Sequence, residues 1–215
     1  MEFLLENILN LVGFLVGLGI GIMSLVGFRN TGSPTLFRLT IAFFSISIGF
    51  FVIWAGYMVE DFVIKAGSLE RWIQTVGIGI QTVGYFFIAF SHSIKSFFPK
   101  SRYFRSVGAL PLFLVSSVQI EHIFRSVSFI LLAYGAIETM LSYFENKNKG
   151  AISVAVGLAL LAFGEFLGWY SFVFPESILY PVSMAIKIGG LIALFIPVSK
   201  IPLTKIKFDE SFDAD

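Results

Sequence analysis

The chain has 215 residues, of which 56% are hydrophobic and only 13% are charged, and its formal net charge is +1. A soluble domain carries about 25% charged residues, so this composition predicts a protein that is surrounded by lipid. Cysteine is absent, which excludes disulfides, thiolate metal sites, iron–sulfur ligation and cysteine nucleophiles. With only two histidines in the chain, a histidine-rich metal or haem site is not expected.

Seven apolar stretches follow one another along the chain, and each is a candidate transmembrane helix. A helix needs about 20 apolar residues to cross a hydrocarbon core of about 30 Å. The predicted spans are residues 7–28, 39–59, 72–94, 106–120, 126–144, 151–174 and 177–198. The fourth contains Pro111 and reaches only about 22 Å unless residues from 103 onward extend it. We therefore predict an all-α polytopic membrane protein.

The first stretch is predicted to be a permanent span. The residues before it, from Met1 to Glu6, include two acidic side chains and no basic ones. A cleaved signal peptide begins with positive charge, so this N-terminus does not fit one.

Basic residues gather in alternate loops and predict the orientation. The first, third and fifth loops and the segment after the last span hold Arg29, Arg38, Lys95, Lys100, Arg102, Arg105, Lys147, Lys149, Lys200, Lys205 and Lys207. The other loops are predicted to hold only Lys65, Arg71 and Arg125. Because excess Lys and Arg mark the cytoplasmic side, we expect the N-terminus outside and the C-terminus inside the plasma membrane.

The spans are predicted to form an internal repeat. Aligning residues 41–57 with residues 156–172 sets Gly49 against Gly164 and Trp54 against Trp169. Similar matches set Gly19 against Gly135 and Gly84 against Gly189. The resulting organisation is a first triplet (7–94), a connector helix (103–120) and a second triplet (124–198), within a transmembrane domain of residues 1–205 followed by an acidic tail (206–215). An odd connector makes the two triplets parallel.

This 3+1+3 plan resembles that of rhodopsin-like proteins and of the SWEET and PQ-loop sugar carriers. It is also similar to uncharacterised archaeal multi-span membrane proteins. The Pro-Gln pair of the carriers is missing from the first and fifth spans. Lys187 stands where the resemblance to microbial rhodopsins would imply the retinal lysine, but Ser183 replaces the usual aspartate, and the third span has no acidic counterion. The resemblance implies a topology and no activity, and it leaves retinal binding open.

Three charged side chains lie inside the predicted spans, namely Glu138, Glu165 and Lys187. An ionised side chain in the hydrocarbon core is costly, so such residues usually pair with one another and often mark functional sites. Glu165 and Lys187 lie at similar depths, about 14 and 15 Å from the outer boundary, and we predict that they form an ion pair. Glu138 is expected slightly deeper, joined through water or protonated. The alternatives are a structural pair and a proton relay or ligand site.

Two further stripes of residues are candidates for helix contacts. Gln74 and Gln81 lie on one stripe of the third span, where interhelical hydrogen bonding is favoured over a polar cavity. Gly13, Gly17 and Gly21 form a row on the first span, and such small residues let helix backbones approach closely. We favour packing within the chain over an oligomer contact for this row.

A metal site on the outer face is a weaker hypothesis. Glu60, Asp61, Glu121 and His122 combine carboxylates with an imidazole, which could bind a divalent cation. Surface acids that only set the topology are commoner, so the metal stays unassigned. The sequence implies no cofactor and gives no support for nucleic-acid binding, because the basic residues are dispersed along the membrane edge.

Three functions remain open. The first is a non-catalytic accessory subunit of a larger membrane complex, with lipid and other subunits or further copies of the chain as partners. The second is a small transporter or an ion or proton conductor that uses the intramembrane Glu and Lys residues. The third is a seven-helix sensor that binds a ligand or chromophore. An enzyme is less expected, because no nucleophile–base pair or known catalytic motif is visible.

Overall fold

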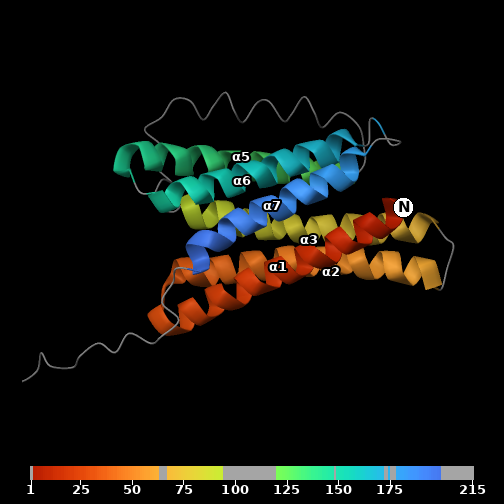
Figure 1. The fold of residues 1–215 in the computed structure, drawn as a ribbon, viewed down its shortest axis with the longest axis horizontal. Helices are drawn as coiled ribbons and strands as arrows, with labels where there is room; N and C mark the ends of the chain where they lie inside the picture. Colours follow the sequence, from red (N-terminus) through yellow and green to blue (C-terminus); the bar gives the residue numbers. More distant parts are fainter. Residues whose placement is uncertain are drawn as a thin grey trace, which may run out of the picture.

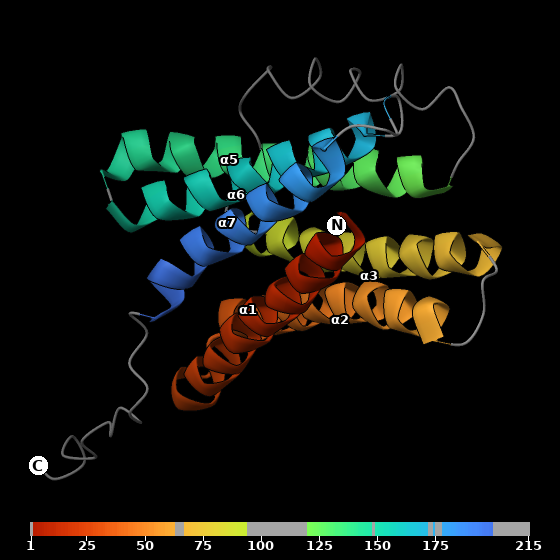
Figure 2. The same cartoon turned by 45° about the vertical axis from the view of Figure 1, so that its right-hand side comes forward.

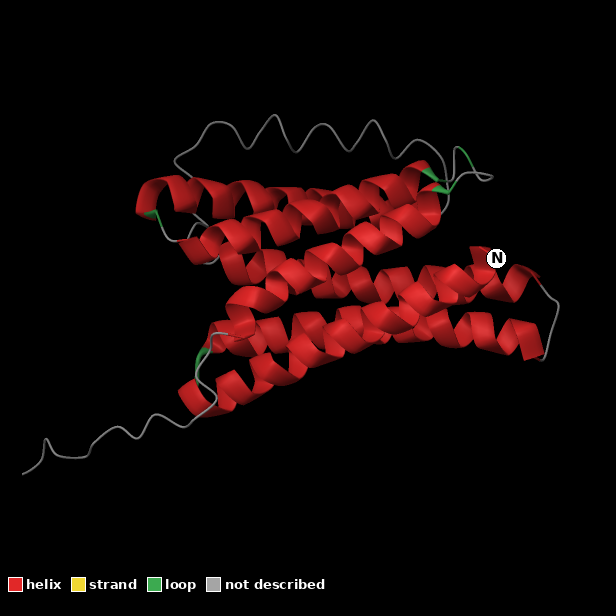
Figure 3. Ribbon diagram, in the orientation of Figure 1, coloured by secondary structure: helices red, strands yellow, loops and turns green. Residues whose placement is uncertain are grey.

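The computed structural model describes residues 2–62, 67–93, 120–147, 149–171, 174 and 178–199. This part of the chain forms six helices: α1 (Glu2–Thr31), α2 (Pro34–Phe62), α3 (Gly67–Ser93), α5 (Ile120–Asn146), α6 (Lys149–Tyr170) and α7 (Leu179–Ser199). All six are long and apolar enough to cross a membrane, and only short loops join them where the connections are described (Figure 3). The described chain is therefore all-α and of the multi-pass type. The predicted fourth span and the acidic tail lie outside the described residues.

The helices extend beyond the charge-free runs from which they were predicted. In lipid every backbone polar group needs an internal partner, so a helix continues past the first charged side chain. The α1 helix ends at Gly32, which adopts a left-handed φ of 66° and donates its N–H to the Phe28 carbonyl at 2.7 Å. Glycine adopts this conformation at helix ends without steric cost. The α5 helix ends similarly at Lys147, with a φ of 49°.

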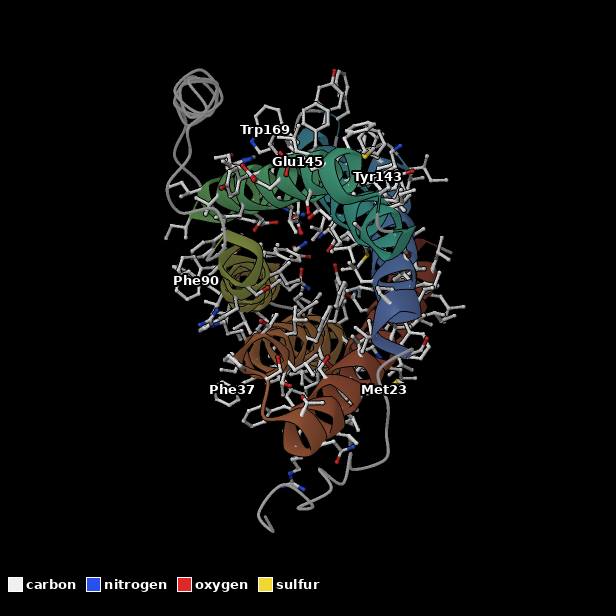
Figure 4. The ribbon with its side chains drawn as sticks, turned by 90° about the vertical axis from the view of Figure 1, so that its left-hand side faces the viewer. Met23, Phe37, Phe90, Tyr143, Glu145 and Trp169 are labelled. Atoms are coloured by element: carbon white, nitrogen blue, oxygen red, sulfur yellow. The ribbon has the colours of Figure 1, made fainter. Side chains whose placement is uncertain are left out.

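The six helices form a closed ring in the order α1, α2, α3, α5, α6, α7 (Figures 1, 2 and 4). Among the described helices, the backbones come close only between neighbours in that order. We call the end of the ring where α1 begins the N-terminal end. Consecutive helices alternate in direction within α1–α3 and within α5–α7.

The α3 and α5 helices run in the same direction. Gly79 packs on Phe124, and further along both helices Thr82 and Ser128 share a hydrogen bond of 2.9 Å. The end of α3 and the start of α5 therefore lie at opposite ends of the ring (Figure 1).

Glycines allow α2 and α3 to approach at backbone distance. A β-carbon at Gly84 would lie 2.6 Å from the Ala42 carbonyl oxygen, and one at Gly49 would lie 2.6 Å from the Gly77 carbonyl oxygen and 2.5 Å from Cγ of Gln81. Real β-carbons essentially never come this close to backbone atoms. Both helices therefore need glycine at these positions.

Glycines also allow α6 and α7 to approach at backbone distance. A β-carbon at Gly190 would lie 2.9 Å from the Gly157 carbonyl oxygen, and one at Gly164 would lie 3.0 Å from the Ser183 carbonyl oxygen and 2.5 Å from Cγ of Lys187. The contacts of the two helix pairs correspond residue by residue. Gly157 and Gly164 of α6 follow Ala42 and Gly49 of α2 by 115 positions. The α7 residues in these contacts follow those of α3 by 106 positions, as Gly190 follows Gly84.

The sequence alignment set Gly84 against Gly189, but Gly190 takes the corresponding packing position. A β-carbon at Gly189 would meet nothing within 4 Å. The alignment was therefore one residue out of step with the packing on α7.

The glycine row of α1 faces α2, as the sequence analysis favoured. In order, Gly13, Gly17 and Gly21 pack on Phe50, Ser47 and Phe44. The row is thus used within the chain.

The main apolar core extends from the middle of the ring toward the end opposite the N-terminal end. Its buried members come from all six helices and are Ile20, Ala42, Phe43, Ile46, Phe50, Tyr85, Ile88, Leu132, Leu158, Leu161, Ala162, Leu191, Leu194 and Val198. A smaller cluster of Ile53, Tyr57 and Ile78 lies nearer the N-terminal end. The larger buried polar side chains also lie toward the N-terminal end, where they form the site described next.

Candidate intramembrane charge network

Arg125 is the residue on which the site is built. It lies in the second turn of α5, one turn after Glu121, and its side chain is 1% exposed. Its Nη2 and Nε atoms donate to Oε1 of Glu121 at 2.9 and 3.1 Å. The prediction that Arg125 lies in a loop is wrong, because α5 begins at Ile120 and the helix carries the side chain into the bundle.

Glu165 of α6 joins this pair to α7. Its Oε2 lies 3.5 Å from Nη1 of Arg125, and its Oε1 lies 2.6 Å from Nζ of Lys187. The ion pair predicted between Glu165 and Lys187 is therefore confirmed. We call Glu121, Arg125, Glu165 and Lys187 the charge network.

The charge network holds equal numbers of positive and negative groups, alternating along the chain of contacts. All four side chains are buried. An isolated buried charge costs several kcal/mol or more, and only close partners offset that cost. The network is therefore stable only as a set, and it ties α5, α6 and α7 to one another.

Two glycines of α6 make room for the long cationic side chains. A β-carbon at Gly164 would lie 2.5 Å from Cγ of Lys187, and a β-carbon at Gly168 would overlap Nη1 of Arg125. The spacing of four residues places both glycines on one face of α6, and Glu165 lies three residues before Gly168, at the side of that face. This local pattern explains how two bulky cations fit beside one helix.

Tyr180 extends the site to α3. The Arg125 guanidinium lies over the Tyr180 ring, 5.8 Å from its centre, and the Tyr180 hydroxyl accepts a hydrogen bond from Nε2 of Gln74 at 2.9 Å. The interhelical hydrogen bonding predicted for the glutamine stripe is thus confirmed at Gln74.

Gln81 behaves differently from Gln74. Its side chain is 1% exposed, and neither its amide nitrogen nor its amide oxygen has a hydrogen-bond partner among the described residues. The predicted interhelical hydrogen bond is therefore not found at this position within the described part of the chain.

Glu138 does not belong to the charge network. It lies on α5, thirteen residues after Arg125, which is about 20 Å along the helix axis. Its side chain is half-buried. The structure therefore brings together two of the three predicted intramembrane charges and leaves the third toward the other end of the ring.

The structure describes the side chains of two of the four residues that were considered as metal ligands. The Glu121 carboxylate binds Arg125, and the His122 ring packs edge-on against Trp169, which Figure 4 labels, with 6.2 Å between ring centres. The side chains of Glu60 and Asp61 lie outside the described residues. Among the side chains that are described, no three metal-binding groups come together.

The chain matches no family model, no curated protein and no solved structure.

Proposed function

We propose that the protein is a non-catalytic integral membrane protein that serves as an accessory subunit of a larger membrane complex. The observation that supports this most is the neutral charge network, in which each of the four side chains contacts an opposite charge. Side chains that neutralise one another fix the rotation and depth of their helices. Buried ion pairs serve such specificity better than they serve stability.

A conducting role has less support from the geometry. A path for ions or protons needs polar groups along the whole length of the ring, whereas the half beyond the network is filled by the apolar core. The buried Thr40 and Thr139 in that half bond to the carbonyls of their own helices.

We also propose the 3+1+3 topology with seven crossings. The seventh crossing is supported by the described helices on either side of it, because α3 ends and α5 begins at opposite ends of the ring. The recurrence of the α2–α3 contacts in α6–α7 supports an internal repeat.

The proposed orientation keeps the N-terminus outside and the C-terminus in the cytoplasm of the cell. Removing Arg125 from the loops leaves only Lys65 and Arg71 as basic residues predicted on the N-terminal side, which strengthens the charge asymmetry.

Native electrophoresis of gently solubilised membranes, with mass spectrometry of the band, tests the accessory role. We expect the 23.9 kDa chain to migrate within a large assembly with fixed partners. Migration alone or as a small homo-oligomer would contradict the proposal. Lys187→Met should weaken assembly, whereas a variant that assembles normally but loses a measurable flux would favour transport.

A further inference from the structure

Four side chains outside the ion pairs are at most 1% exposed and have no hydrogen-bond partner among the described residues, namely Ser24, Gln81, Tyr85 and Ser183. Ser24 lies toward the far end of α1, away from the charge network, whereas Gln81 and Tyr85 of α3 and Ser183 of α7 lie toward it. Gln81 leaves both an amide donor and an amide acceptor unused, and Tyr85 and Ser183 each leave a hydroxyl. Native proteins pair most of their buried polar atoms, so each exception asks for an explanation.

The three groups on α3 and α7 lie inside the ring and on facing sides of it. The Tyr85 hydroxyl is close enough to interact with the charge of Glu165, although it does not meet the geometry of a hydrogen bond. Because α3 and α6 are not neighbours in the ring, this approach crosses the interior. Gln81 precedes Tyr85 by one helical turn and therefore lies on the same face.

Ser183 approaches from the other side. A β-carbon added at Gly168 would lie 3.1 Å from the Ser183 hydroxyl and would also meet the Arg125 guanidinium. The Ser183 hydroxyl therefore lies near Arg125. In the packing correspondence between the two helix pairs, Gln81 takes the position of Lys187, since each packs its Cγ against the equivalent glycine of the neighbouring helix. The α2–α3 pair thus has the Gln81 amide at the position where the α6–α7 pair has the Lys187 ammonium.

We propose that Gln81, Tyr85 and Ser183 bind a small uncharged molecule that both donates and accepts hydrogen bonds. The ligand is uncharged because the adjacent charge network is already neutral, and an added charge would be buried without a partner. It both donates and accepts because the Gln81 amide offers one group of each kind. It is small because Ile46 and Phe50 of the apolar core lie on the neighbouring α2. Water and a solute of a few atoms share this chemistry.

The sign of a stability change tests the site in the purified full chain. If the Tyr85 hydroxyl bonds to a ligand, Tyr85→Phe should lower Tm by about 2–4 °C, the shift expected for one hydrogen bond in a chain of this length. Tyr180→Phe is the matched control, because it removes a hydroxyl that has a partner in Gln74. A Tyr85→Phe variant with unchanged or raised Tm would overturn the proposal, because removing an unpartnered buried hydroxyl relieves a cost. Gln81→Leu should shift Tm in the same direction as Tyr85→Phe.

Two further measurements separate the sources of the ligand. Radiolytic hydroxyl labelling modifies residues beside bound water, so water at the site should give fast labelling of Tyr85 despite its burial. A solute should instead appear as added mass in native mass spectra of the wild-type chain and be lost from Gln81→Leu. Slow labelling together with no added mass would overturn the proposal. None of these results depends on the accessory role, which is tested by assembly.

Discussion

At the residue scale, Arg125 holds the charge network together, because its guanidinium contacts Glu121 of its own helix and Glu165 of α6. A span predicted from hydropathy stops at a charged side chain, because an unpaired charge does not stay in lipid. The helix does not stop there, and the charge is tolerated since Glu121 and Glu165 neutralise it. The spacing of Glu121 and Arg125 by four residues was the signal that could have placed both on one helical face. The Glu165–Lys187 pair was predictable because depth on two consecutive helices follows from residue counts.

The charge network gives the first prediction, a double-mutant cycle. Glu165→Gln leaves a net charge of +1 in the network and Lys187→Met leaves −1, whereas the double variant is neutral again. We expect each single variant to lose about 3–5 kcal/mol of unfolding free energy, because it leaves an uncompensated buried charge. The double variant should be more stable than either single variant, since the Glu121–Arg125 pair remains. Reversible unfolding of the purified protein by denaturing detergent measures all three.

The control for this cycle is Glu145→Gln, which removes a charge from an exposed position at the end of α5. We expect a change within about 0.5 kcal/mol, as for most surface substitutions. Additive losses in the double variant would mean that the two residues do not stabilise each other, and the network would then be an inadequate account of this region.

At the element scale, glycine positions decide how the helices approach. The sequence analysis favoured packing of the α1 glycines within the chain, which the structure bears out, and it aligned Gly49 with Gly164, two glycines that make similar close contacts in their helix pairs. It could not fix the register on α7, where Gly189 and Gly190 are adjacent and composition cannot tell which of them faces a neighbour. Only the packing distinguishes the backbone contact at Gly190 from the open space at Gly189.

These adjacent glycines give a matched pair of substitutions. Gly190→Ala would bring a β-carbon within 2.9 Å of the Gly157 carbonyl oxygen and 2.9 Å of Leu161, so we expect a loss of about 1–3 kcal/mol. Gly189→Ala should be neutral or stabilising by up to about 1 kcal/mol, because alanine favours the helix and meets no neighbour. Thermal unfolding of the two variants under the same conditions measures the difference. Equal effects would contradict the close approach of α6 and α7.

At the scale of the whole molecule, the ring has a polar half and an apolar half. Composition was sufficient to predict an all-α multi-pass protein, and six of the predicted spans correspond to described helices. Nothing in composition could place Gln81 or Tyr85 toward the charge network, because that depends on which helices close the ring. The closure follows from the parallel α3 and α5, which leave α1 and α7 as neighbours.

The ring and its orientation can be tested together with single cysteines, since the natural chain has none. Thr31 and Glu145 are exposed residues at the ends of α1 and α5, and Ile178 is exposed just before α7. In intact cells a membrane-impermeant maleimide should label Ile178→Cys, whereas Thr31→Cys and Glu145→Cys should react only after permeabilisation. The unmodified chain is the background control. Labelling of all three with the opposite pattern would reverse the orientation but keep the ring. Thr31→Cys and Glu145→Cys on different sides of the membrane would rule out the ring itself, because parallel α1 and α5 must end on the same side.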